Sequence, residues 1–224
     1  MTVLGEEQIV QLREELTGTL DRLLARGRDA AVFGRAQAEC AAAAEALCAG
    51  PAVACRAGCP HCCVLNVAIL LPEGLLAANW LREHLGVGEV ARLRERLAAH
   101  CRRIRWMDDE ERIFKRTTCP FLDAAGCCII HPVRPLMCRA VASWDSDSCR
   151  AAFAPLPDEE GRLVPADRLR QAAYDAAFVT LAGNLQRHGL DDRSIELGAG
   201  VLGFLDNPGL RCEFLDGNRL PRTL

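Results

Sequence analysis

The chain has 224 residues, of which half are hydrophobic and a quarter are charged, and its formal net charge is −3. This composition is typical of a globular domain and lacks the basic excess of nucleic-acid-binding proteins. Aromatic residues make up only 5% of the chain, so a surface that stacks bases is not expected either. The acidic start has no signal-peptide pattern, and no stretch reaches the roughly 18 apolar residues of a membrane span. We therefore expect a cytoplasmic protein that binds neither nucleic acid nor membrane.

The cysteine content is the feature of the composition that needs a special explanation. The chain has 13 cysteines, and thiols in the cytoplasm are kept reduced. The odd number also argues against a fully paired disulfide scaffold. Metal binding is the expected explanation.

The first half of the chain reads as helices interrupted by one loop. Leucines recur on one stripe between residues 6 and 26, which predicts a helix, and an alanine-rich helix is predicted over 35–48. A glycine- and proline-containing loop follows over 51–61, and the apolar run 64–71 fits a strand or the entry of a helix. Helices are predicted over 72–84 and 87–106. The charged run 108–116 is expected to be a solvated face or turn.

In the second half, Pro132 and Pro135 make a regular helix around Arg134 unlikely to form. A polar linker is predicted over 155–165, helices over 167–188 and 194–205, and an irregular tail from residue 207. The expected fold class is mainly α, with helices packed around a loop-rich, cysteine-ligated metal-cluster core. We expect an N-terminal helical segment (1–50), a cysteine-cluster metal-binding domain (51–150) and a C-terminal helical segment (151–224), which together form one compact unit.

Two groups of cysteines supply the candidate metal ligands. The first has the spacing C-x3-C-x2-C-C within nine residues, and the second is spread over residues 119–149. The candidate ligands are Cys55, Cys59, Cys62, Cys63, Cys119, Cys128, Cys138 and Cys149. Eight thiols exceed the four that a tetrahedral zinc ion needs, so either two metals bind or one cluster binds with spare thiols nearby.

The spacing favours an iron–sulfur cluster over zinc. Zinc ribbons present two C-x2-C pairs, which this chain lacks, whereas iron–sulfur proteins often combine a compact cysteine run with remote cysteines. A 4Fe-4S cluster is the favoured cofactor, with mononuclear iron or zinc as alternatives. Cys55, Cys59 and Cys62 also reproduce the triad of the radical S-adenosylmethionine enzymes, but the chain is too helical and too short for their barrel.

A longer motif carries a resemblance to a known family. After the first cysteine group, the chain reads Cys119-Pro-Phe-Leu-Asp, then Cys128, His131, Arg134-Pro135 and Cys138-Arg139. This arrangement resembles the zinc- or iron-chelating cysteine-cluster proteins of the YkgJ type, of which the flagellin lysine-N-methylases are a distant branch. The chain differs in having His131 where the family often has tyrosine, and in having the extra thiol of Cys127 beside Cys128. The resemblance implies a protein that binds a metal or a cluster.

Arg134 and His131 are the candidate cofactor-binding side chains next to these thiols. The Arg134 guanidinium could donate to sulfur or hold a substrate carboxylate, or it could satisfy loop carbonyls. Asp145 and Asp147 are either general bases or parts of a solvated turn. Three roles stay open: an enzyme that modifies a protein or peptide side chain, a module that stores, delivers or senses metal, and a metal site that only stabilises the fold.

Overall fold

The computed structural model describes residues 3–48, 53–153, 164 and 166–221. Helices dominate these residues, so the expected mainly-α fold is confirmed. The linker predicted over 155–165 lies outside the described residues, except for Val164, as do the first two residues of the predicted loop 51–61. No helix in the described ranges is long and apolar enough to cross a membrane.

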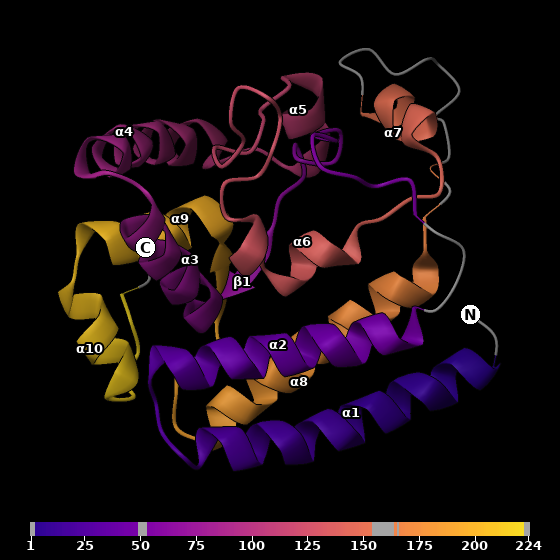
Figure 1. Ribbon diagram of the computed structural model, residues 1–224, viewed down its shortest axis with the longest axis vertical. Helices are drawn as coiled ribbons and strands as arrows, with labels where there is room; N and C mark the ends of the chain where they lie inside the picture. Colours follow the sequence, from indigo (N-terminus) through magenta and orange to yellow (C-terminus); the bar gives the residue numbers. More distant parts are fainter. Residues whose placement is uncertain (1–2, 49–52, 154–163, 165, 222–224) are drawn as a thin grey trace.

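Three long helices form one layer of the molecule, along the lower edge of Figure 1: α1 (Val3–Leu24), α2 (Ala30–Leu47) and α8 (Arg168–Arg187). The leucine stripe of α1 is buried, as its periodicity predicts: Leu12, Leu16 and Leu20 are almost fully enclosed. α2 begins five residues earlier than predicted. The reason is a helix cap, because the Asp29 carboxylate accepts a hydrogen bond from the amide of Val32 at 2.8 Å.

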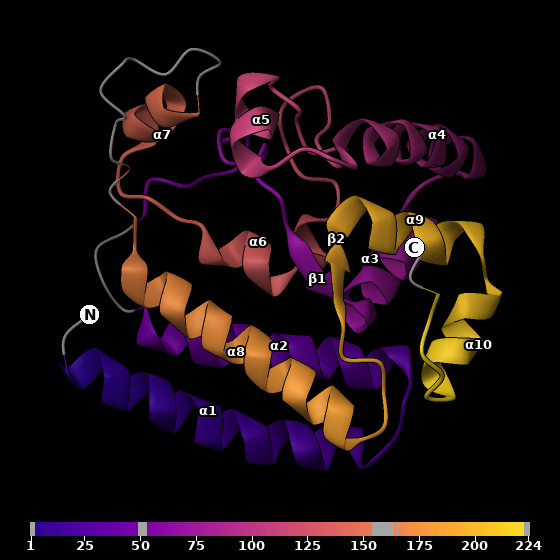
Figure 2. The ribbon, with the colours of Figure 1, turned by 180° about the vertical axis from the view of Figure 1, so that it is seen from behind.

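A second layer packs against α2 and consists of α3 (Leu71–His84), α4 (Val87–Ile104), α9 (Leu197–Asp206) and α10 (Gly209–Leu215). The strands β1 (Ala68–Leu70) and β2 (Ser194–Glu196) precede α3 and α9 and pair antiparallel. Figure 2 shows both strands from the side of α9. In the register, Ile69 lies opposite Ile195. Of the apolar run 64–71, residues 68–70 form the strand and Leu71 already begins helix α3, so each of the two alternatives holds in part.

The helix predicted over 194–205 is present as α9, but it starts only at Leu197 because residues 194–196 pair with β1. The tail expected to be irregular contains α10, because Leu210 and Phe214 find buried positions in the core. The Phe214 ring centroid lies 5.5 Å from that of Phe33 in α2, so α10 joins the two layers.

Short elements connect the layers and carry the cysteines: α5 (Asp109–Phe114), the 3₁₀ turn η1 (His131–Val133), α6 (Leu136–Ala140) and α7 (Ser146–Ala152). The charged run was expected to be a solvated face or a turn, and it contains the partly exposed helix α5 instead of a plain turn. Its N-cap is Asp108, whose carboxylate accepts from the amide of Glu111 at 2.8 Å. Around Arg134 the chain forms η1 and the five-residue α6 in place of a longer regular helix, as the two prolines predict.

Candidate metal centre

The two cysteine groups, remote in sequence, lie against each other in space. The amide of Cys119 donates to the carbonyl of Cys63 at 2.6 Å. The loops also meet at two glycines with left-handed backbone, Gly58 (φ +78°) and Gly126 (φ +76°). A Cβ on Gly126 would lie 3.5 Å from the carbonyl oxygen of Gly58, an ordinary contact distance, so the two loops are close neighbours here. The positive φ angles are what favour glycine at both positions.

A tight turn arranges the second cysteine group. The Asp123 carboxylate accepts from the amides of Ala125 and Cys127, at 2.9 and 2.8 Å, and Leu122 pairs with Cys128 across the turn. Successive residues of an extended strand point to opposite sides. Cys128 packs against the core, while the Cys127 sulfur would lie 4.0 Å from a Cβ on Gly58. The neighbouring thiols of Cys127 and Cys128 therefore face different surroundings.

Four of the eight predicted thiols border one cavity, and we name them the first thiol set: Cys55, Cys59, Cys62 and Cys149. The cavity has a volume of about 230 Å³ and is also lined by His61 and Ser143. Burial raises the pKa of Cys149, and its three partner thiols raise it further, while a hydrogen bond with Ser143 opposes the rise. Cys149 is thus electrostatically coupled to all three cysteines of the other loop.

Three more predicted thiols form the second thiol set: Cys119, Cys128 and Cys138. Burial raises the pKa of Cys119 to about 12, with a contribution from Cys128. Burial also raises the pKa of Cys138, and the neighbouring Cys119 and Cys128 add to the rise. Thiols that raise one another's pKa values in this way lie close enough to interact, and they stay protonated until a cation compensates their charge.

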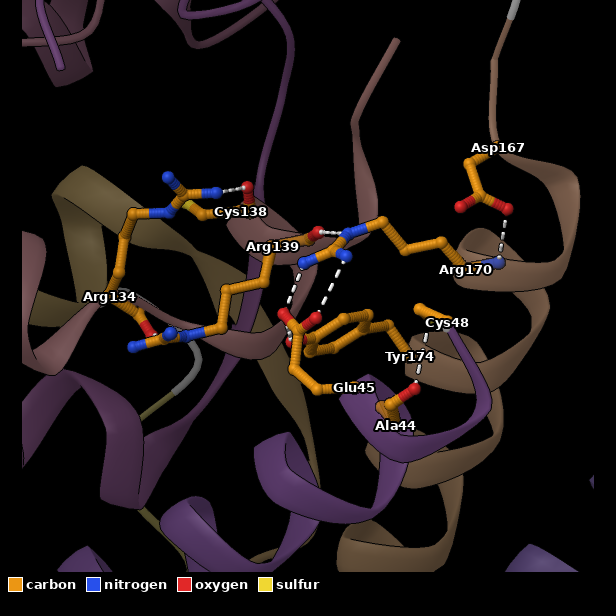
Figure 3. Close-up of polar contacts among 9 residues, drawn as sticks. All are labelled: Ala44, Glu45, Cys48, Arg134, Cys138, Arg139, Asp167, Arg170 and Tyr174. Carbon is orange, nitrogen blue, oxygen red and sulfur yellow. Dashed lines mark hydrogen bonds and ion pairs between the residues drawn. The ribbon is translucent and has the colours of Figure 1, made fainter. Parts of the chain in front are cut away.

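Cys63 and Arg134 connect the two sets. A hydrogen bond with the Cys63 thiol raises the pKa of Cys62, and burial adds to the effect. Burial also raises the pKa values of Cys128 and Cys138, and the positive charge of Arg134 opposes the rise in these two thiols and in Cys62, so its guanidinium lies near thiols of both sets. It donates to the carbonyl of Cys138, as Figure 3 shows. The Nε of Arg134 is buried and has no hydrogen-bond partner among the described residues.

The donor chemistry fits a soft metal, but the sulfurs are not gathered around one point. Thiolate sulfur suits zinc, iron and iron–sulfur clusters. Among the described residues, no group of three or more Cys, His, Asp and Glu side chains could hold a metal ion as the side chains are placed. The structure therefore brings the cysteine loops together without forming a coordination polyhedron. The buried Nε of Arg134 fits an acceptor in this region, because an unpaired buried N–H is costly.

The remaining predicted side chains have simpler surroundings. His131 is exposed, and partial burial together with the charges of Arg134 and Arg139 lowers its pKa. Asp145 caps α7, since its carboxylate accepts from the amide of Asp147 at 2.9 Å. Asp147 is exposed and pairs with Arg150, one turn along the same helix. Of the two readings of these aspartates, the structural one matches these contacts.

Sequence reasoning missed two residues beside the thiols. His61 lines the cavity of the first thiol set, and its place between Cys59 and Cys62 was the available signal. Glu73 is fully buried, and its two carboxylate oxygens accept from the amides of Leu70 and Leu136, at 2.9 and 2.8 Å. Burial raises the pKa of Glu73 to about 7. No local pattern marks this carboxylate, because its second partner lies 63 residues away.

Comparisons with known proteins agree with the motifs. Residues 54–155 match the model of the CxxCxxCC family, described as a putative zinc- or iron-chelating domain. Neither the curated proteins nor the solved structures give a match to the chain, so a relationship to the flagellin lysine-N-methylases is not shown. The matched range contains both thiol sets and Arg134. Over residues 54–155 the chain is thus similar to the CxxCxxCC family model, whose description is a putative zinc- or iron-chelating domain.

Proposed function

We propose that the protein chelates iron in the cytoplasm as an iron–sulfur cluster, with the cluster ligands drawn from the eight predicted thiols. The observation that carries the proposal is the joining of the two cysteine loops, through the 2.6 Å hydrogen bond from Cys119 to Cys63 and the close approach of Gly58 and Gly126. A fold that only buried cysteines as small apolar residues would have no need to place seven of these thiols in two coupled sets.

Arg134 supports a cluster over a lone ion. Its unpartnered Nε is buried near thiols of both sets, where sulfur would be the acceptor. N–H groups that donate to sulfur set the potential and stability of iron–sulfur clusters. When bound, the cluster would supply electron transfer or Lewis-acid chemistry. The chain's own part is to present thiolates, donate this N–H and shield the sulfurs from water.

Binding must also move the thiols and release protons. Burial and neighbouring thiols raise the pKa values of Cys62, Cys119, Cys138 and Cys149, so these groups are protonated near neutral pH. Metal ligation requires thiolates and therefore displaces the protons. The four sulfurs that border the 230 Å³ cavity would then draw inward around the metal.

The test is an anaerobic preparation in which iron, zinc and acid-labile sulfide are counted per chain and compared with the visible spectrum. We expect brown protein that contains iron and sulfide. Colourless protein with stoichiometric zinc and no sulfide, even after reconstitution with iron and sulfide, would replace the cluster by a structural zinc site. Protein that retains neither metal would contradict both assignments.

A further inference from the structure

The segment that carries Cys138 is held by side chains from three helices outside its own loop. At its start, the amide of Leu136 donates to the buried Glu73 of α3 at 2.8 Å. The carbonyl of Arg134 accepts from Gln37 of α2 at 3.0 Å. At its end, the carbonyl of Arg139 accepts from the Nε of Arg170 in α8 at 2.8 Å. The contacts with Leu136 and Arg139 satisfy an amide and a carbonyl of α6 that so short a helix cannot pair internally, and the contact with Arg134 holds the residue just before it.

Arg170 is the outer end of a hydrogen-bonded chain that leads to Cys138 (Figure 3). Its Nε holds the carbonyl of Arg139, the Nε of Arg139 donates to the carbonyl of Arg134 at 2.9 Å, and the Arg134 guanidinium donates to the carbonyl of Cys138. Each arginine thus fixes the backbone that carries the next. This series of hydrogen bonds therefore connects α8, in the layer of long helices, to the candidate metal centre.

Glu45 and Tyr174 fix the guanidinium of Arg170 from the opposite side. Both terminal nitrogens of Arg170 donate to the Glu45 carboxylate, one of them at 2.9 Å, and the Tyr174 hydroxyl donates to the same carboxylate at 2.7 Å. The Arg170 side chain is only 13% exposed. A planar fork can bind a carboxylate with two nitrogens while Nε binds a carbonyl, and a lysine ammonium cannot reproduce that geometry.

We propose that Arg170, oriented by Glu45 and Tyr174, is a positioning residue for the metal centre: it holds α6 so that Cys138 and Arg134 face the other thiols. Arg170, Glu45 and Tyr174 lie outside the matched family range of 54–155. The helical layer would therefore act on metal affinity through the backbone of α6. The part of this inference that concerns metal rests on the proposed chelation, whereas the part that concerns Cys138 does not.

The test compares Arg170→Lys with Arg193→Lys, a matched control. Arg193 also forks onto a carboxylate, that of Asp191, and also donates to a carbonyl, that of Leu220, in a part of the chain that contributes none of the thiols. Two readouts separate positioning from stability. The first is zinc affinity by competition with a chromophoric chelator, together with the visible spectrum of the cobalt-loaded protein. The second, on metal-free protein, is the alkylation rate of Cys138 and the hydrogen exchange of residues 136–140.

We expect Arg170→Lys to weaken zinc binding by about tenfold or more, as for other residues that orient metal ligands. It should also shift the cobalt spectrum and speed both alkylation of Cys138 and exchange in α6. Arg193→Lys should lower stability without these changes. If Arg170→Lys fails to fold, Glu45→Gln serves instead, because it weakens the fork but keeps the bond from Arg170 to Arg139. Its effects should have the same direction and a smaller size.

The outcomes distinguish the two proposals. Wild-type protein that binds neither zinc nor iron contradicts the proposed chelation, and the measurements on metal-free protein still test the role of Arg170. Unchanged Cys138 alkylation and unchanged α6 exchange in Arg170→Lys overturn the positioning role. Equal effects in Arg170→Lys and Arg193→Lys overturn it as well, since they would reflect a general loss of stability.

Discussion

Glu73 is a fully buried residue with an ionisable carboxyl group, and burying its charged form is unfavourable for folding. Its oxygens bind the amides of Leu70 and Leu136, so it joins the start of α3 to the start of α6. Burial disfavours the charged form and raises its pKa to about 7, while both backbone hydrogen bonds oppose that rise. The group is therefore expected to change its protonation near neutral pH.

This raised pKa predicts a pH dependence of stability. Because the folded pKa is about 7 and that of a free glutamate is 4.5, the folded state binds more protons between these values. The contribution of Glu73 to stability is then fully present below about pH 4.5 and is lost as the pH rises through about 7. Glu73→Gln, which cannot ionise, should lack this loss. The measurement is urea unfolding of both metal-free proteins at about pH 5 and about pH 8. Parallel pH profiles would contradict the prediction.

Individual cysteines should differ sharply in their effect on metal content. Cys59→Ala and Cys138→Ala each remove a thiol from one of the two sets, so both should lose metal and stability together. Cys40→Ala and Cys212→Ala should keep their metal. Cys40 is buried against α8, with its sulfur 3.9 Å from the carbonyl of Ala177, and Cys212 is exposed on α10. Metal per chain, measured after identical reconstitution, checks all four. If Cys40→Ala lost as much metal per chain as Cys59→Ala, the proposed set of metal ligands would be wrong.

Among the elements, the long helices were predictable and the short ones were not. Leucine and alanine periodicity marks α1, α4 and α8, because their apolar faces repeat over several turns. α5 and α7 are too short to show a helical period. The only local sign of each helix is the aspartate at its N-cap, which is overlooked when the charged residues are interpreted as a solvated face or turn. β2 cannot be found locally at all, since its three residues become a strand only by pairing with β1.

The cap of α7 gives a prediction about one thiol. Asp145 accepts from the amide of Asp147 and from the hydroxyl of Ser148, and Cys149 lies in the same short helix. Asp145→Ala should remove these hydrogen bonds at the start of α7 and let the helix fray. We therefore expect faster alkylation of Cys149, measured by mass spectrometry of metal-free protein. The control is Asp108→Ala, which removes the cap of α5. Equal Cys149 alkylation rates in wild type and Asp145→Ala would contradict the prediction.

At the scale of the whole molecule, both helical layers bind α6, the short helix that carries Cys138. α3 contributes Glu73 and α8 contributes Arg170, and both bind the backbone of α6. The cysteine spacing was enough to choose the candidate metal ligands, because residue type and short spacing can be read directly from the sequence. Their division into two sets was not predictable, because it depends on contacts such as that between Cys63 and Cys119. The same holds for Arg170, whose partner Glu45 is 125 residues away.

If metal draws the two thiol sets inward, binding must stabilise the loops more than the helical layer. A ligand that binds only the folded state adds about 2.7 kcal/mol at a free concentration 100 times its dissociation constant. In a chain of this size that corresponds to a rise of roughly 5–10 °C in melting temperature. We expect this rise on reconstitution, with new protection from hydrogen exchange over residues 55–63 and 119–138 and little change within α1. Cys59→Ala, treated identically, should gain neither. Stoichiometric binding without a change in melting temperature or in loop protection would mean that the metal occupies the surface, and that the two cysteine groups meet for a reason other than chelation.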